Sequence, residues 1–196
     1  MMTGNRTLCK NILTALIMVL FPNIYTHAAG IGTWRNYLSY HDVTQIEQGS
    51  NNMLYVLASN GLYSYNTNDH SLQTFDKANV LSDCDISLIK WNTSAKRLMI
   101  VYSNGNIDIM DNSANVINIS DYYTKSMTED KTVNDIYMYG KYAMMATGFG
   151  IVQINISDCE ISNTYNLGFN VNYCYVQDNS LYAASKSNGI YSCSMN

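Results

Sequence analysis

The chain has 196 residues, of which 13% are charged, and its formal net charge is −4. A nucleic-acid-binding surface needs clustered basic residues, so this balance argues against a nucleic-acid partner. Seventeen Tyr, eleven Met and a single Pro are typical of a β-rich globular chain rather than a disordered one. The length fits one domain or a piece of a larger one.

The first residues have the parts of a secretory signal peptide. Arg6 and Lys10 make the start positive, residues 12–21 form an apolar stretch, and small residues follow. About ten apolar residues are too few to span a membrane, which takes about 20; a membrane anchor is the alternative. We predict a signal peptide at 1–28 and an exported mature chain at 29–196, without a transmembrane segment in the mature chain.

A strand is predicted at residues 34–40 (WRNYLSY), where side chains alternate between two faces. After it, a hairpin pattern recurs: an apolar run, a turn with glycine, and an alternating return strand. The four copies cover residues 54–65, 98–111, 142–154 and 181–191, and their turn glycines are Gly61, Gly105, Gly150 and Gly189. Asn104-Gly105 predicts a tight type I′ turn, in which both residues have positive φ.

The spacing of the four glycines favours a β-propeller. They lie about 44, 45 and 39 residues apart, near the ~40–45 residues of a four-stranded propeller blade. Four unrelated hairpins in a β-sandwich are the alternative, but sandwich strands recur at about 8–12 residues without such a longer period. We predict an all-β fold, a partial β-propeller of about four four-stranded blades, preceded by the signal peptide.

Each blade adds an inner strand before its hairpin and an outer strand after it. The inner strands are predicted at 43–48, 86–91, 133–139 and 171–177, and the outer strands at 72–75, 116–119 and 160–165. No outer strand follows the fourth hairpin. Residues 34–40 could supply it and close a four-bladed ring. Truncation is the rival, and it would expose two apolar blade faces.

Four cysteines belong to the mature chain: Cys84, Cys159, Cys174 and Cys193. Export permits disulfides, and Cys174 with Cys193 is the pair to test. Because the cysteines are single and partly within strands, free buried thiols are the preferred interpretation.

No metal site is predicted, because His27, His41 and His70 lack partners at ligand spacing. The connections rich in Asn and Asp indicate turn capping. Calcium binding is the alternative, although no calcium-binding loop motif is present.

No residue is assigned a catalytic role, and no cofactor is expected. Asp42 follows His41, but adjacent strand residues point to opposite faces. Loops could pair two of four carboxylates as in a glycosidase, although structural roles are preferred: Asp83, Asp85, Asp108 and Asp135. The tyrosines of the blades could stack on sugars, but packing between blades is preferred: Tyr55, Tyr63, Tyr65, Tyr102, Tyr137, Tyr139 and Tyr182.

Several segments resemble the N-terminal β-propeller of the PorZ family, a surface component of the type IX secretion system of Bacteroidetes. They are residues 32–40, the hairpin at 98–111, and 131–137 leading into the ATGFGIV run at 146–152. The similarity extends from about residue 32 to the end. Members of the family also have a second propeller and a C-terminal sorting domain. The resemblance therefore implies that this chain is the first part of one propeller, a gene fragment or an early stop.

The resemblance also implies a function. The family joins an attachment complex with a sortase at the outer-membrane surface of Gram-negative bacteria and binds anionic lipopolysaccharide, which helps to anchor secreted cargo. No binding residue carries over to a numbered position. We expect a non-enzymatic module, exported to that surface or to the periplasm. Two alternatives are a propeller hydrolase and the periplasmic sensor of a hybrid two-component regulator, whose repeats resemble residues 54–62.

Overall fold

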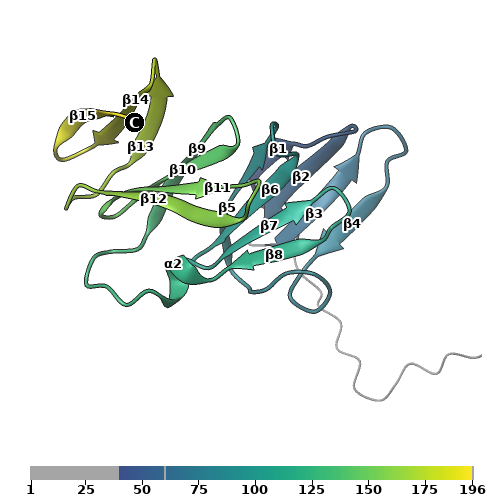
Figure 1. Cartoon of the computed structure of the whole chain (residues 1–196). Coiled ribbons are helices and arrows are strands. Elements are labelled where there is room, and N and C mark those ends of the chain that lie inside the picture. Colours follow the sequence, from purple (N-terminus) through teal and green to yellow (C-terminus); the bar gives the residue numbers. More distant parts are fainter. Residues whose placement is uncertain (1–39, 60, 196) are drawn as a thin grey trace, which may run out of the picture. The chain divides into compact units, whose positions relative to one another are not determined.

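The computed structural model describes residues 40–59 and 61–195, so the predicted signal peptide and nearly all of the strand predicted at 34–40 lie outside them. The described strands form four antiparallel sheets, each built from strands consecutive in the sequence (Figure 1). These sheets confirm the predicted all-β partial propeller, and we refer to them as blades 1 to 4.

Blade 1 contains β1 (Val43–Gln48), β2 (Met53–Ala58), β3 (Gly61–Asn66) and β4 (Leu72–Phe75). Blade 2 contains β5 (Ile86–Asn92), β6 (Arg97–Tyr102), β7 (Ile107–Asp111) and β8 (Val116–Ile119), followed by the short helix α2 (Asp121–Thr124). Blade 3 contains β9 (Val133–Tyr139), β10 (Tyr142–Thr147), β11 (Gly150–Asn155) and β12 (Glu160–Asn166). Blade 4 contains β13 (Tyr173–Gln177), β14 (Ser180–Ser185) and β15 (Gly189–Ser194).

Most predicted strand positions agree with these bounds. The main difference is β13, which begins at Tyr173 rather than Val171. The backbone N–H of Val171 donates to the carbonyl of Thr147 in blade 3, at 2.9 Å. Val171 therefore belongs to the connection between two blades.

Each blade has two faces, which we name by sequence direction: the forward face is turned to the next blade and the backward face to the preceding one. In β6, Leu98 and Ile100 belong to the core shared with blade 1, whereas Met99 and Val101 belong to the core shared with blade 3. Burial on both sides explains why this strand has no polar face. Each such side chain contributes about 1.5–3 kcal/mol when fully buried.

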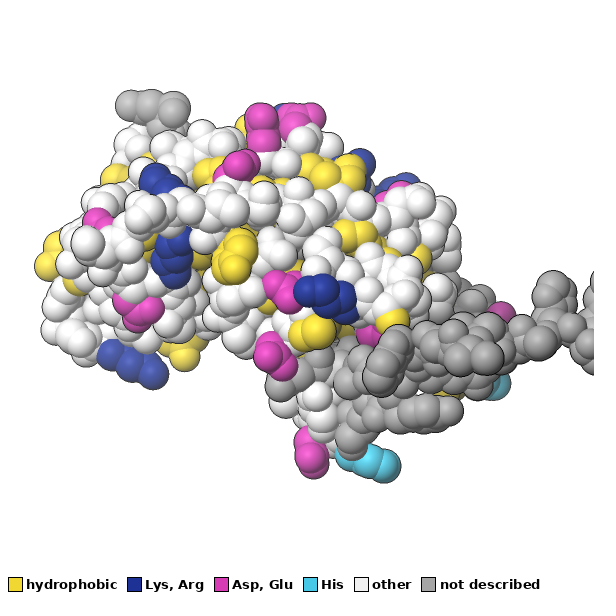
Figure 2. All heavy atoms as spheres, turned by 90° about the horizontal axis from the view of Figure 1, so that it is seen from below, with side chains coloured by type: hydrophobic (Ala, Val, Ile, Leu, Met, Phe, Trp, Pro, Cys, Tyr) yellow, Lys and Arg dark blue, Asp and Glu magenta, His cyan; other side chains and the backbone are white. Residues whose placement is uncertain are grey.

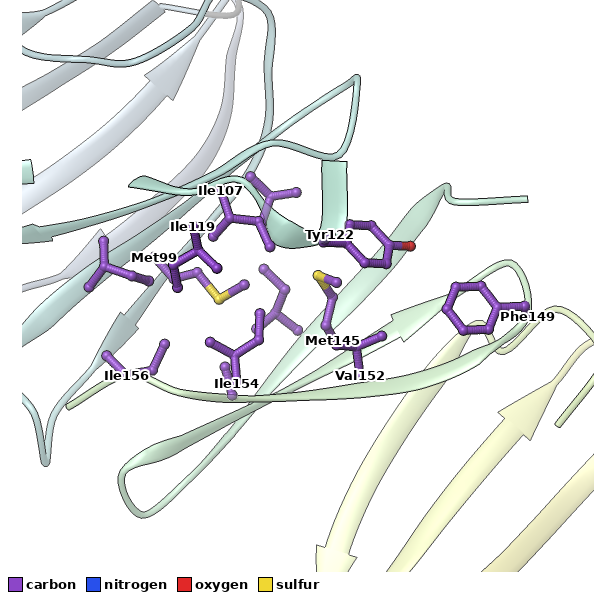
Figure 3. Packing of buried hydrophobic residues seen from close by; sticks show 13 residues of the cluster. Met99, Ile107, Ile119, Tyr122, Met145, Phe149, Val152, Ile154 and Ile156 are labelled. Carbon is purple, nitrogen blue, oxygen red and sulfur yellow. The ribbon is translucent and has the colours of Figure 1, made fainter. Parts of the chain in front are cut away.

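Figure 3 shows the core between blades 2 and 3. Met99, Ile107 and Ile119 of blade 2 face Met145, Val152 and Ile154 of blade 3. Similar buried clusters join blade 1 to blade 2 and blade 3 to blade 4. In the described part of the chain, no cluster joins blade 4 to blade 1, so these residues do not close a four-bladed ring.

Polar side chains of the inner strands also join neighbouring blades. The side-chain amide of Gln45 in β1 donates to the carbonyl of Ile89 in β5 at 2.5 Å and accepts from its N–H at 3.0 Å. Glu47 accepts from Lys90 Nζ at 2.9 Å and from the N–H of Trp91 at 3.2 Å. These contacts satisfy backbone groups of an inner strand that would otherwise be unpaired.

The type I′ turn predicted at Asn104-Gly105 is wrong. Gly105 has a φ of 87°, but Asn104 is not among the residues with positive φ. The N–H of Gly105 donates to the carbonyl of Tyr102 at 2.8 Å, and the N–H of Tyr102 donates to the carbonyl of Asn106 at 3.0 Å. This is a longer loop with glycine at a bulge. The Asn104 side chain favours it by accepting from the N–H of Asn106, at 2.9 Å.

The four described cysteines are free thiols, as the preferred interpretation of the sequence predicted. The expectation that they are buried is only partly right. Cys174 is buried, and its thiol donates to the carbonyl of Met144 at 3.2 Å. Cys84 and Cys193 are exposed. Cys193 lies on β15, which is exposed along its whole length and has β14 as its only partner among the described strands. Cys174 and Cys193 form no disulfide, because strand β14 lies between their strands β13 and β15.

Candidate functional site: the open faces of blades 1 and 4

The four predicted turn glycines occupy two kinds of position. Gly105 and Gly189 have φ values of 87° and 85°, which favour glycine. Gly61 and Gly150 are the first residues of β3 and β11, directly after the turn. At Gly150 a Cβ atom would lie 2.1 Å from the carbonyl oxygen of Tyr165, so a close approach of two strands requires glycine there.

The structure brings three of the four candidate carboxyl residues to one end of blade 2. Asp108 is fully buried and accepts from the Tyr102 hydroxyl, from the N–H of Ser82 and from Asn118 Nδ2, at 2.5, 2.8 and 2.8 Å. Burial first, and this contact with Asp108 second, raise the pKa of Tyr102 well above its usual value. Such a saturated network is typical of a structural role.

The two neighbouring carboxyl residues also bind the turn of blade 2. Asp83 accepts from Asn104 Nδ2 at 2.7 Å and from Lys77 Nζ at 3.2 Å. The Asn104 hydrogen bond is the main reason why the pKa of Asp83 is lowered. The carbonyl of Asp85 accepts from the N–H and hydroxyl of Ser103, at 2.9 and 3.0 Å. These bonds fix the connection between blades 1 and 2. Asp135 belongs to β9 of blade 3.

The pair His41 and Asp42 contributes its backbone to the first hairpin. The carbonyl of His41 accepts from the Ser59 hydroxyl at 2.6 Å, and the carbonyl of Asp42 accepts from the Ser59 N–H at 3.3 Å. Among residues 40–59 and 61–195, no three His, Cys, Asp or Glu side chains are grouped as metal ligands would be. In the same residues, no helix has the length and hydrophobicity to span a membrane.

Several of the singled-out tyrosines pack between blades. Tyr55 stacks on Trp91 of blade 2, with ring centroids 5.5 Å apart and an interplanar angle of 18°. Tyr137 of blade 3 contacts Tyr175 of blade 4 at 4.8 Å. Tyr102 is buried between blades 1 and 2. Tyr139 is exposed.

The backward face of blade 1 is apolar, and no blade of the described residues packs on it. It holds a hollow of about 410 Å³, lined by Tyr40, Leu54, Val56, Tyr63, Tyr65, Leu72 and Thr74. Tyr40 packs edge-on against Tyr63 with centroids 5.5 Å apart. The hydroxyl of Tyr65 bonds His70 Nδ1 at 2.5 Å. Leu72, on the outer strand β4, is 65% exposed.

The forward face of blade 4 likewise has no blade packed on it within residues 40–59 and 61–195, and tyrosine dominates this face. A hollow of about 330 Å³ is lined by Tyr173, Cys174, Tyr175, Gln177, Tyr182, Ala184 and Ile190. Tyr173 is 57% exposed and Ile190 is 77% exposed. Exposed apolar side chains gathered on one face are typical of an interaction surface. The sequence could place tyrosines in these strands, but only the packing shows that two faces have no neighbouring blade among the described residues.

Strand β15 forms the edge of blade 4. All six of its residues are exposed, and no described strand pairs with it on the side away from β14. A hollow of about 300 Å³ lies beside it, between blades 3 and 4, and Ile151, Leu167, Leu181 and Tyr191 are among its lining residues. On the face shown in Figure 2, acidic and basic side chains are interspersed rather than gathered by sign.

Residues 54–196 match a family model that is described as "TSS9, PorZ, N-terminal beta-propeller domain". The chain belongs to this family. A solved structure of PorZ from Porphyromonas gingivalis, described as an essential bacterial surface component of the type-IX secretion system, is 26% identical with a TM-score of 0.72. The match covers 83% of this chain and 24% of the PorZ chain, so the chain spans about a quarter of that protein.

Two further structures share the fold. The extracellular domain of the putative hybrid two component system BT4673 from B. thetaiotaomicron is 20% identical, with a TM-score of 0.60 over 77% of this chain and 20% of that one. The computationally designed Ika4 protein is 8% identical, with a TM-score of 0.62 over 81% of this chain and 94% of that one. No curated protein matches the chain.

Proposed function

We propose that this chain is a non-enzymatic β-propeller scaffold or binding module of the type IX secretion system. It would act in an attachment complex, together with a sortase, that anchors secreted cargo at the outer-membrane surface. The observation that carries the proposal is the PorZ domain match over residues 54–196, together with 26% identity to a PorZ described as a surface component of that system.

The geometry supports binding rather than chemistry. The buried Asp108 and the half-buried Asp83 both use their carboxyl oxygens in hydrogen bonds within blade 2 or to the connection before it. The open faces instead present tyrosines, which are enriched in protein interfaces. The same rings offer flat surfaces on which sugars can stack. An anionic lipopolysaccharide is therefore the proposed ligand besides the partner proteins.

Gene deletion in the producing bacterium tests the scaffold role. We expect a type IX cargo protein to leave the cell surface and appear in the medium, and the intact gene to restore attachment. An outer-membrane protein that does not use this system serves as the control and should be unaffected. Cargo that stays attached in the deletion strain would contradict the proposal.

Binding to purified lipopolysaccharide tests the ligand separately. The chain should bind vesicles that contain the anionic form, and vesicles that contain a neutral form serve as the control. The double variant Tyr173→Ala/Tyr175→Ala should weaken binding about tenfold if stacking carries it. Equal binding to both vesicles would remove lipopolysaccharide from the proposal without affecting the scaffold role.

The alternative is the periplasmic sensor region of a hybrid two-component regulator, which the fold shared with BT4673 favours. In that case the deletion would change transcription in response to an extracellular ligand, and cargo attachment would be unchanged. The same deletion strain therefore separates the two candidates.

A further inference from the structure

We infer that Asn188-Gly189, in the loop between β14 and β15, is a site of spontaneous deamidation, whereas the same dipeptide at Asn104-Gly105 is protected by its hydrogen bonds. The product is a mixture of aspartate and isoaspartate at position 188. The inference rests on the loops of blades 2 and 4 and is independent of the proposed function.

The reaction needs water and no enzyme. The backbone nitrogen of the glycine attacks the side-chain carbonyl carbon (Cγ) of the asparagine and forms a C–N bond. The side-chain amide leaves as ammonia, which takes up the proton of the attacking N–H. Water then opens the resulting succinimide ring, at Cγ to give aspartate or at the main-chain carbonyl carbon to give isoaspartate. Glycine favours the attack because it has no Cβ atom to crowd the nitrogen.

The two sites have the same local sequence. Ser-Asn-Gly occurs at residues 103–105 and 187–189, and a third time at 59–61, where Asn60 lies outside the described residues. The reactivity of the triplet itself is therefore the same at both sites.

Backbone conformation and exposure do not separate the two sites either. Gly105 and Gly189 have nearly equal positive φ values, 87° and 85°. Asn104 and Asn188 are both exposed to solvent. A difference in reactivity must therefore come from the hydrogen bonds that hold each loop.

Both reacting groups of the blade 2 loop are held by such bonds. Asn104 Nδ2 donates to Asp83 at 2.7 Å, and Asn104 Oδ1 accepts from the N–H of Asn106 at 2.9 Å. The attacking nitrogen, that of Gly105, donates its hydrogen to the carbonyl of Tyr102 at 2.8 Å. These bonds must break before the nitrogen can reach Cγ, so the free energy of opening the loop adds to the barrier.

The side chain of Asn188 has no such restraint. Within residues 40–59 and 61–195, no hydrogen bond holds its amide group, and only its backbone N–H is bonded, to Ser185 Oγ at 3.3 Å. Gly189 pairs with Ser185 as the last pair of the hairpin. End pairs of this kind open at little cost, so the side chain and the attacking nitrogen can meet.

The parts of blade 4 that could restrain Asn188 are themselves described. Asp83 belongs to the connection before blade 2, and the corresponding connection before blade 4 bonds the loop only through Asn172, which accepts from the N–H of Lys186 at 2.8 Å. Asn106 lies two positions after Asn104, and the corresponding residue of blade 4 is Ile190, with no bond to the Asn188 side chain. The difference between the two sites is therefore internal to their loops.

Deamidation would change the hairpin in two ways. Each event replaces a neutral amide by a carboxylate and so adds one negative charge. Isoaspartate also lengthens the main chain by one carbon atom, which displaces the pair of Ser185 and Gly189 at the start of β15.

Peptide mass spectrometry on the purified full chain tests the inference. The chain is incubated in mildly alkaline heavy-oxygen water, so that every ring opened during the incubation carries the label. Asn188 should react at least about tenfold faster than Asn104, since about 1.4 kcal/mol of opening free energy is a factor of ten. Incubation in urea is the matched control, in which the two rates should agree within about twofold because the loop bonds are lost.

Two variants identify the cause of the difference. Asn188→Gln keeps an amide but forms the ring far more slowly, so the acidic form seen by isoelectric focusing should largely disappear. Asp83→Ala removes one restraint on Asn104, which should then react several-fold faster while the rate at Asn188 stays unchanged. Circular dichroism verifies folding, and Asp83→Ser replaces the alanine variant if that variant does not fold.

Three outcomes would overturn the inference. The first is a difference between Asn188 and Asn104 in the folded chain that is smaller than about tenfold. The second is a difference that persists in urea, because the sequence rather than the fold would then cause it. The third is an Asn104 rate that the substitution of Asp83 leaves unchanged.

Discussion

Tyr102 donates its phenolic hydrogen to Asp108 at 2.5 Å, and both side chains are buried. The same carboxyl group accepts from the N–H of Ser82 in the connection that follows blade 1, and from Asn118 in the outer strand β8. The Asp108 side chain thus joins strand β6, strand β8 and the connection that precedes blade 2. Removing a single donor leaves part of a buried polar group unpaired, which costs free energy.

Tyr102→Phe should therefore lower the free energy of unfolding by about 1–3 kcal/mol, because it removes the hydroxyl and keeps the ring. Urea unfolding followed by circular dichroism measures the change. Tyr123→Phe, at an exposed position of α2, is the control and should stay within about 0.5 kcal/mol of the unchanged chain. Equal stabilities for the two variants would show that the contact with Asp108 contributes nothing.

Gln45→Ala should destabilise the contact between blades 1 and 2. The substitution leaves the N–H and carbonyl of Ile89 without their side-chain partner, at a cost of about 1–3 kcal/mol. The measurement is again urea unfolding. Gln73→Ala on the exposed strand β4 removes the same side chain without such a contact and should be nearly neutral. The prediction fails if both alanine variants unfold at the same urea concentration.

Gly150→Ala and Gly140→Ala form a matched pair. An added Cβ at Gly150 would meet the Tyr165 carbonyl oxygen at 2.1 Å, whereas at Gly140, with φ of 56°, it would meet nothing within 4 Å. Gly140→Ala should cost only the left-handed backbone penalty of about 1–2 kcal/mol. Gly150→Ala must displace β12 as well and should cost more, which thermal unfolding can measure. A smaller loss at position 150 than at position 140 would contradict the argument.

Stability should fall in acid. Hydrogen bonds from Asn104, Asn115 and Thr132 lower the pKa of Asp83, Asp111 and Asp130 respectively. A carboxyl group with a lowered pKa in the folded state stabilises the fold above its unfolded pKa of about 3.9, and this contribution is lost as the pH falls through the folded value.

Urea midpoints measured from pH 6 down to pH 2 should therefore decrease most steeply below about pH 4. Asp83→Asn removes one of the carboxyl groups with a lowered pKa, so its profile should be flatter in that range. A variant profile parallel to that of the unchanged chain would exclude a contribution from Asp83.

Thiol labelling should separate the cysteines. Cys84 and Cys193 are exposed, whereas Cys174 is buried, and burial raises the pKa of its thiol to about 12. Because the thiolate is the reactive form, Cys174 should resist a maleimide at pH 8 until urea unfolds the chain. Mass spectrometry of the labelled peptides measures this, with Cys193 as the internal control. Labelling of Cys174 in the folded chain as fast as Cys193 would show that blade 4 is not packed as described.

The sequence predicted the blades well because their signals are local. The apolar run at Leu98–Tyr102 reflects the burial of those five residues, and the bounds of β1, β4, β8 and β9 agree with prediction. The alternation at Ile107–Ile109 does not reflect burial in the same way, because Asp108 is buried as well. The turn at Asn104 was mispredicted because Asn106 pairs with Tyr102 rather than with Ser103, so the loop has three residues instead of two.

The remaining features depend on residues far apart in the chain. The bond between Gln45 and Ile89 joins residues 44 positions apart, and no local pattern indicates it. A side chain at position 150 is excluded because its Cβ atom would clash with the carbonyl oxygen of Tyr165 in the next strand. The open faces likewise became visible only once the neighbour of each blade was known. The candidate site could therefore be predicted as tyrosine-rich strands, but not as a surface.

The three-stranded blade 4 has a consequence for how the chain fluctuates. Each blade shares a buried core only with its sequence neighbours, so local unfolding costs least where only one neighbour is present. Blades 2 and 3 are held on both sides. Among the described residues, blade 4 has one neighbour and one strand fewer, so its amide hydrogens would exchange with solvent before those of the interior blades. Any molecule that covers its forward face would act as the missing neighbour and slow that exchange.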